Sequence, residues 1–121
     1  KKLEPLRAYC LTKPGAYEDF PFDNVTLTFR VKGKMFALCN VNDKPLELNL
    51  KCDPELSELL REKYDAVKPG WHMNKHHWNT VTLDGSIPER EVLELIDMSY
   101  ELVVKSLSKS ERAKLTVKPR A

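Results

Sequence analysis

The sequence predicts an α+β fold in which helices cover one face of an antiparallel sheet. In residues 25–31 and 46–51, apolar and polar residues alternate with a period of two, which is typical of strands with one buried face. In residues 87–107, apolar residues recur every three or four positions, which is typical of an amphipathic helix. One-sided strands and helices bury their apolar surfaces against each other, so we expect a two-layer sandwich.

The expected elements follow the order α-β-β-β-α-β-α. The helices are predicted at residues 3–11, 54–64 and 87–107, and the strands at 25–31, 34–39, 46–51 and 79–83, with room for one more strand in 68–75. Asp53 before Pro54 is the usual start of a helix, an N-cap acid followed by proline at the first helical position. Ser86 and Glu89 have the spacing of a capping box at the start of the longest helix.

The turn at Lys32-Gly33 fixes an expected register for the first hairpin. A two-residue loop there sets Phe29 opposite Phe36 and places Leu27 opposite Leu38. The expected core face is then Val25, Leu27, Phe29, Val31, Phe36, Leu38, Leu46, Leu48 and Leu50. The expected solvent face is Thr26, Thr28, Arg30, Met35, Ala37, Cys39, Glu47, Asn49 and Lys51.

Length and composition indicate one globular domain. The chain has 121 residues, 41% of them hydrophobic and 31% charged, and its formal net charge is +2. Residues 105–121 carry six basic residues against Glu111, so the other 104 residues have a net charge of −3. We therefore expect a single domain over 1–107 followed by a basic, mobile tail over 108–121.

The same composition argues against a membrane or secreted protein. No apolar stretch is long enough for a membrane-spanning helix, and the first residues lack the apolar region of a signal peptide. Three cysteines form no CxxC pair, which suggests neither a disulfide framework nor a cysteine zinc site. We expect a cytoplasmic protein without metal or cofactor.

The most unusual segment is residues 71–78, which holds both tryptophans and all three histidines. Its candidate residues are Trp71, His72, Lys75, His76, His77 and Trp78. Aromatic rings can stack on bases, and lysine or protonated histidine can neutralise phosphates, so the pattern is compatible with nucleic-acid binding. A second interpretation has Trp71, His72, His76 and Trp78 lining a small-ligand pocket. A third is structural, with the two tryptophans closing the edge of the core.

A second group of basic residues surrounds the first hairpin. Arg30, Lys32, Lys34 and Lys51 lie in or beside its strands, where they form an anion-binding patch or keep a sheet edge soluble. Enzyme motifs such as GxSxG, HExxH and a phosphate-binding glycine loop are absent. A nucleophile built from Cys39 or Cys52 and a histidine is disfavoured because buried strand cysteines are usually inert. We expect a protein that is not an enzyme.

Six stretches, in this order, resemble the bacterial MmcQ/YjbR family over about residues 5–107. They are 11–16 (LTKPGA), 19–22 (DFPF), 33–37 (GKMFA), 49–54 (NLKCDP), 69–79 (PGWHMNKHHWN) and 99–100 (SY). The resemblance implies a frataxin-like (CyaY-like) α+β fold and a double-wing type of DNA binding. It also implies that Lys34, Lys51, Lys75, His76, His77 and Trp78 face the nucleic acid.

The leading hypothesis is therefore a non-enzymatic DNA-binding protein of modest affinity for duplex DNA. Phosphate contacts are assigned to Arg30, Lys34, Lys51 and Lys75, and stacking or hydrogen bonding to His76, His77 and Trp78. The alternative is a small-ligand or protein-interaction module with the Trp/His-lined pocket. The DNA target, the physiological ligand and the oligomeric state stay open at this stage.

Overall fold

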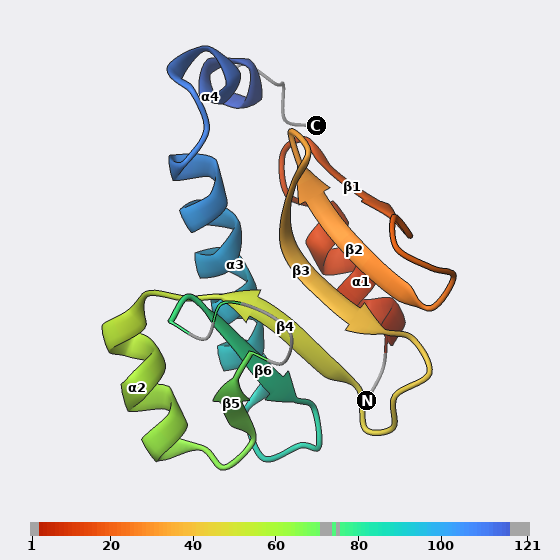
Figure 1. Cartoon of the computed structure of the whole chain (residues 1–121), viewed down its shortest axis with the longest axis vertical. Coiled ribbons are helices and arrows are strands. Elements are labelled where there is room, and N and C mark those ends of the chain that lie inside the picture. The colour runs from red at the N-terminus through yellow and green to blue at the C-terminus, as the bar shows by residue number, and fades with distance from the viewer. Residues whose placement is uncertain (1–2, 71–73, 75, 117–121) are drawn as a thin grey trace.

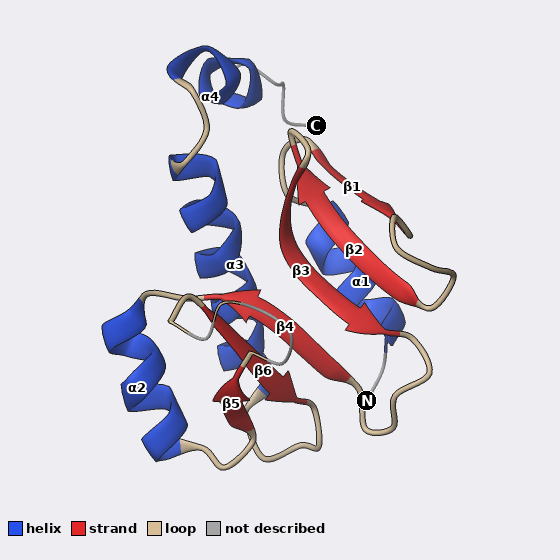
Figure 2. Ribbon diagram, viewed as in Figure 1, coloured by secondary structure: helices blue, strands red, loops and turns tan. Residues whose placement is uncertain are grey.

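The computed structural model describes residues 3–70, 74 and 76–116. In chain order their elements are α1 (Leu3–Leu11), β1 (Ala16–Asp19), β2 (Thr26–Val31), β3 (Lys34–Asn40), β4 (Glu47–Lys51), α2 (Pro54–Lys63), β5 (Val67–Pro69), β6 (Trp78–Thr82), α3 (Glu89–Lys105) and α4 (Lys109–Thr116). Figures 1 and 2 show their arrangement. The expected α+β class and antiparallel sheet are confirmed.

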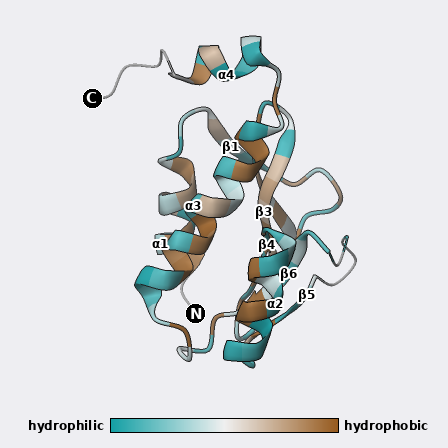
Figure 3. Ribbon diagram, turned by 90° about the vertical axis from the view of Figure 1, so that its left-hand side faces the viewer, coloured by the Kyte–Doolittle hydropathy of each residue, from teal (hydrophilic) through white to brown (hydrophobic). Residues whose placement is uncertain are grey.

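The six strands form one sheet in the order β1-β2-β3-β4-β6-β5, and every neighbouring pair is antiparallel. Helices α1 and α3 lie on one side of the strands, as the view along the sheet shows (Figure 3). Helix α2 lies beside the β5 and β6 end of the sheet (Figure 1). The opposite face of the sheet is not covered by a described helix and is called the open face below.

Two described elements, β1 and α4, are absent from the expected order, and a third, β5, overlaps the region left open for a further strand. Strand β1 has no apolar alternation, and it forms because it pairs with β2 and because its Glu18 is bound by Arg7 of α1. The two Arg7–Glu18 hydrogen bonds measure 2.8 and 2.5 Å. Strand β5 is only three residues long and begins at Val67, just before the region where the sequence leaves room for a further strand. Short edge strands depend on such tertiary contacts, so local sequence patterns predict them poorly.

The expected register of the first hairpin is correct next to the turn, where Val31 pairs with Lys34 and Arg30 with Met35, but is wrong by one residue beyond them. Phe29 pairs with Ala37 and Leu27 with Cys39, because a β-bulge leaves Phe36 without a partner on β2. Ala37 and Cys39 are therefore buried on the core face rather than exposed to solvent. Leu38, assigned to the core face from the sequence, lies on the open face.

Ser99 of α3 satisfies the backbone at this bulge. Its hydroxyl donates to the carbonyl oxygen of Phe36 at 2.5 Å and accepts the backbone N–H of Lys51 at 2.9 Å. The next residue, Tyr100, packs edge-on against the Phe36 ring at 5.3 Å and donates to the carbonyl of Pro14 at 2.6 Å. The Ser-Tyr pair thus joins α3 to two strands and to the turn before β1.

The helix starts follow the sequence at α2 but not at α3. The Asp53 carboxylate accepts the backbone N–H groups of Glu55 and Leu56, which confirms the expected N-cap. At α3 the N-cap residue is Pro88, which makes no side-chain cap hydrogen bond. The expected capping box is absent because Ser86 bonds the Asp84 carboxylate instead, through both its backbone N–H and its hydroxyl.

The basic segment after residue 107 contains a helix where the sequence analysis expected a mobile tail. Helix α4 includes Leu115, which is buried and belongs to the core cluster. A Cβ atom added at Gly15 would lie 2.5 Å from Leu115 Cδ2, so α4 packs directly on the turn before β1. The division of the chain at residue 107 stays a prediction from the sequence.

Candidate functional site

Strand pairing arranges the open face in rows that run across the sheet. One row contains Tyr17 on β1, Arg30 on β2 and Met35 on β3. The paired residues Lys51 of β4 and Trp78 of β6 lie at the same end of the sheet as this row. The neighbouring row is Asp19, Thr28, Leu38, Asn49, Thr80 and Lys68. The register therefore brings three candidates, Arg30, Lys51 and Trp78, onto the same face.

Arg30 is held against the sheet by its neighbours. Its Nε lies 3.3 Å from Asp19 Oδ1, and its Nη1 donates to the carbonyl of Gly33 at 3.0 Å. The hydroxyl of Thr28 donates to the same carboxylate at 2.5 Å. This hydrogen bond, followed by the guanidinium of Arg30, holds the pKa of Asp19 below its ordinary value. Arg30 is thus a partly neutralised cation whose main contacts lie within the sheet.

Trp78 is a buried residue, with 9% of its surface exposed. Its backbone carbonyl accepts the N–H of Gly70 at 2.8 Å, and a Cβ at Gly70 would lie 2.8 Å from the Trp78 Cβ. Glycine is therefore needed at position 70 for the end of β5 to approach this tryptophan. Stacking of the indole on a base, as expected from the sequence, would require the ring to become exposed.

The two described histidines lie in a turn organised by Asn74. The Asn74 carbonyl accepts the backbone N–H groups of His77 and Trp78, and its side-chain oxygen accepts that of His76 at 2.9 Å. The carbonyl of His77 in turn accepts the N–H of Cys52 at 2.8 Å, which joins the turn to the end of β4. Both histidines are exposed.

The remaining candidates of this segment, Trp71, His72 and Lys75, lie outside the described residues. The Trp/His-lined pocket that needs two of them stays a prediction. Among residues 3–70, 74 and 76–116, no group of three or more His, Cys, Asp and Glu side chains is placed to hold a metal ion. Within the same residues, no helix is long and apolar enough to cross a membrane.

Lys34 lies on the helix-covered side of the sheet. Its Nζ is 3.4 Å from the hydroxyl of Ser106, the C-cap residue of α3. The candidates expected to form one surface are therefore divided, because Arg30 and Lys51 lie on the open face and Lys34 does not.

This contact gathers lysines that are far apart in the sequence. Lys32 and Lys34 of the β2–β3 turn, Lys105 at the end of α3, and Lys109 and Lys114 of α4 are all exposed. They lie at the end of the molecule where the turn, the end of α3 and α4 come together (Figure 1), and we call them the lysine end. No ion pair in the described part of the chain involves any of the five.

Two neighbours of the lysine end have other roles. The Nη1 of Arg112 donates to the carbonyls of Lys105 and Leu107, so this cation caps the end of α3. Glu111 caps the start of α4 by accepting the backbone N–H of Ser108 at 3.2 Å. The sequence signal for this surface was the excess of basic residues after 104, but only the fold places them beside the hairpin lysines.

The cysteines are placed for packing rather than for reaction. All three are free and buried. Burial raises the pKa of Cys10 to about 12 and that of Cys39 to about 11, and it also raises the pKa of Cys52. Reactive cysteines need a lowered pKa and access to solvent, and these thiols have neither.

A polar cluster joins α1 to α3 on the helix side. The Tyr9 hydroxyl donates to Asp97 Oδ1 at 2.7 Å, and Lys13 forms an ion pair with the same oxygen. Burial acts to lower the pKa of Lys13, but the Asp97 carboxylate outweighs burial and raises it. The Lys13 ammonium also lies 4.7 Å from the centre of the Tyr9 ring. The polar groups of this cluster are bonded to each other, as expected for a contact that holds two helices together.

Comparison with known proteins identifies the chain's relatives. The YjbR family model matches residues 11–102. The uncharacterised protein YjbR of Escherichia coli K12 is 37% identical over 110 residues, which cover 91% of this chain and 93% of that protein. The uncharacterised protein YbdF of Escherichia coli O157:H7 is 36% identical over 96 residues, or 79% of each chain.

Solved structures agree with this result. A Deinococcus radiodurans protein with a DUF419 domain superimposes with a TM-score of 0.92 at 43% identity, covering 96% of this chain and 88% of that chain. A Pseudomonas syringae protein superimposes with a TM-score of 0.72 at 29% identity, covering 84% and 98%. The likeness to frataxin stays a prediction. The family match and these identities over most of the chain show that it belongs to the YjbR family.

Proposed function

We propose that the chain is a DNA-binding protein that contacts backbone phosphates with its lysine end. The observation that carries the proposal is the gathering of five exposed lysines from three chain segments, none in an ion pair among the described residues. Lysine ammonium groups neutralise phosphates and release condensed counterions, which supplies most of the sequence-independent affinity for DNA. A local concentration of positive charge can act in this way even on a chain whose net charge is only +2.

The proposal extends from the lysine end to the neighbouring part of the open face. Leu50 pairs with Ala37, so Lys51 lies at the end of the sheet that carries the Lys34 turn. The carbonyl of His77 accepts the backbone N–H of Cys52, which joins the turn carrying the exposed His76 and His77 to this end of the sheet. We assign Lys51 and the two histidines to a second set of contacts, together with Lys75 as expected from the sequence. The buried Trp78 holds the segment in place.

We further propose that the protein acts by binding and not by catalysis. The burial and raised pKa of the thiols support this view, because no described cysteine is prepared as a nucleophile. The polar cluster at Asp97 has its groups bonded to each other, which fits a structural role.

The proposal can be tested by measuring duplex binding with fluorescence anisotropy at several salt concentrations. Five phosphate contacts give a slope of log K against log salt of about −4.5, and a loss of affinity of roughly 500-fold between about 50 and 200 mM salt. The double variant Lys34→Ala/Lys105→Ala should make the slope less steep by about 2. The matched control Arg90→Ala/Lys44→Ala removes the same charge from exposed positions elsewhere, at the start of α3 and between β3 and β4, and should leave the slope unchanged.

Equal slopes for the double variant and its control would contradict the lysine end as the DNA site. A slope that changes only with Lys51→Ala or Lys75→Ala would move the site to the open face, as the sequence analysis expected. Absence of duplex binding at about 50 mM salt would contradict DNA binding itself.

A further inference from the structure

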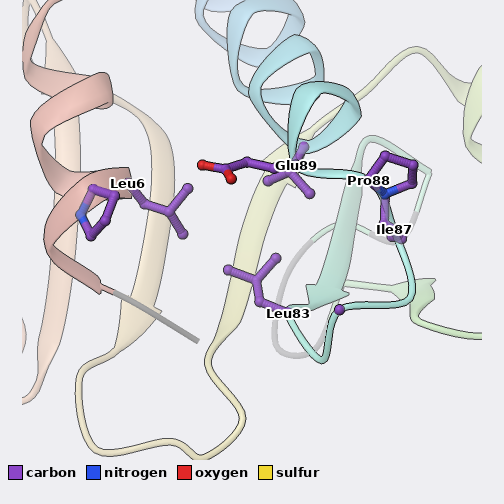
Figure 4. Close-up of a pocket in the computed structure, with 8 residues that line it drawn as sticks. Leu6, Leu83, Ile87, Pro88 and Glu89 are labelled. Carbon is purple, nitrogen blue, oxygen red and sulfur yellow. The ribbon is translucent and has the colours of Figure 1, made fainter.

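A pocket lies between α1 and the start of α3 (Figure 4). The start of α3 is the opposite end of that helix from the lysine end (Figure 1). Its volume is about 360 Å³. Small-molecule sites begin at roughly 300 Å³. The pocket is thus large enough for a small ligand.

The walls of the pocket are largely apolar and come from three segments. Leu6 of α1 forms one wall, Leu83 and Ile87 of the β6–α3 connection form another, and Val92 of α3 closes it. Leu6, Ile87 and Val92 are buried core residues, which fixes three sides of the pocket. A ligand must therefore present an apolar body to enter it.

Glu89 supplies the charged group of the lining. Figure 4 shows its side chain directed across the pocket toward Leu6. The neighbouring carboxylate on this helix, Glu91, accepts the Tyr64 hydroxyl at 2.6 Å and is paired with Lys63. By contrast, the Glu89 carboxylate has no hydrogen-bond or ion-pair partner within the part of the chain that the structure describes.

We propose that this pocket binds a small molecule with an apolar body and a cationic amine, and that Glu89 pairs with the amine. The apolar walls account for the body of the ligand, and the unpartnered carboxylate accounts for the sign of its charge. The Glu89 carboxylate repels phosphate, so the pocket is not part of the phosphate contacts proposed for the lysine end.

The test uses three compounds of nearly equal size and different charge: 4-phenylbutylamine, 4-phenylbutanol and 4-phenylbutyrate. Amide chemical shifts of the ¹⁵N-labelled chain are followed during titration. The amine should shift the amides of Leu6, Gly85 and Val92 with a Kd of about 4 mM or tighter, as its eleven heavy atoms allow. The alcohol should bind more weakly, and the carboxylate most weakly.

Two variants separate the roles of charge and shape. Glu89→Gln should weaken amine binding by about 2- to 5-fold, which is the strength of an exposed ion pair, and should leave the alcohol unchanged. The control Glu94→Gln changes an exposed carboxylate of α3 that does not line the pocket, and it should retain the preference for the amine. Leu83→Trp should fill the pocket and abolish the shifts from all three compounds.

The proposal is overturned if about 10 mM amine causes no shift at these amides, given the affinity expected for a ligand of this size. It is also overturned if amine and alcohol bind equally well to the unmodified chain, or if Glu89→Gln retains the preference for the amine. Shifts that persist in a folded Leu83→Trp variant would place the compound elsewhere.

Discussion

Replacement of Gly15 with alanine tests whether α4 is packed on the domain, on which the lysine end depends. Gly15 has a φ of +74°, and Gly33 in the hairpin turn has a φ of +83°. Both backbones are in the left-handed region, which costs an L-residue about 1–2 kcal/mol. A Cβ at Gly33 meets nothing within 4 Å, whereas a Cβ at Gly15 lies 2.5 Å from Leu115 Cδ2. Only Gly15→Ala therefore adds a steric conflict with α4.

The size of that conflict is limited by what Leu115 loses when it is displaced. Full burial of a leucine side chain is worth about 1.5–3 kcal/mol. We expect Gly33→Ala to lower the free energy of unfolding by about 1–2 kcal/mol and Gly15→Ala by about 2.5–5 kcal/mol. In a Leu115→Ala background the steric part disappears, so the two glycine variants should then cost the same.

Urea unfolding of the two glycine variants, of Leu115→Ala, of the two double variants and of the unmodified chain measures these free energies. The difference between the Gly15→Ala costs with and without Leu115 gives the coupling between the turn and α4. Gly15→Ala and Gly33→Ala that agree within about 0.5 kcal/mol in the full chain would show that α4 is not packed on the turn, since independent sites add to within that limit. The lysine end would then lose two of its five cations.

Three further predictions concern groups whose environment the structure defines. The pKa of Asp19 is lowered by the hydrogen bond that its carboxylate accepts from the Thr28 hydroxyl. The stability that this carboxylate contributes to the fold is therefore complete above the ordinary pKa of 3.8 and is lost as the pH falls through the lowered value. Asp19→Asn should flatten the acid side of a urea-unfolding series from about pH 2 to 5. Cys10 and Cys39, with pKa values of about 12 and 11, should react with a disulfide reagent at about pH 8 only after unfolding. Because these folded-state values exceed the ordinary 9.0, stability should also decline as the pH rises above 9.0, and a rapid native reaction would contradict both statements. Asn79→Ala removes a buried amide that donates to Ser57 at 3.2 Å and should cost about 1–3 kcal/mol in thermal unfolding, whereas a loss under about 0.5 kcal/mol would show that water replaces the bond.

The sequence predicted elements whose signals are local. The alternation in β2 predicts which of its apolar residues face the core, and Asp53 before Pro54 predicts a helix start, because these signals lie within a few neighbouring residues. No such local signal predicts the register of β3. Its residues 35–39 are all apolar, so they fit either face equally well, and the bulge at Phe36 selects one. The bulge is held by Ser99, which lies 63 positions further along the chain.

Helix α4 shows the same limit for a different reason. Leu115 is its one large apolar residue, so the segment has little helical periodicity of its own. Short helices gain most of their stability from tertiary packing, and here the packing partner is the Gly15 turn. A basic segment without periodicity was therefore interpreted as a tail, although its conformation depends on a contact 100 positions away.

The same limit applies to the candidate site, because residues that are close in the sequence differ from residues that the fold brings together. Residues 71–78 were predicted as a site because aromatic and basic residues are concentrated there. In the structure, however, Trp78 is buried and the His77 carbonyl accepts the N–H of Cys52, which follows β4. Some of these aromatic and basic residues are thus explained by the packing of the start of β6. The lysines that we propose as phosphate contacts are dispersed between positions 32 and 114, and they meet because Lys34 reaches the end of α3 and α4 packs beside it. Any change that displaces α4 should therefore weaken the proposed DNA binding and the stability together, whereas a change confined to Lys51 should affect the proposed binding alone.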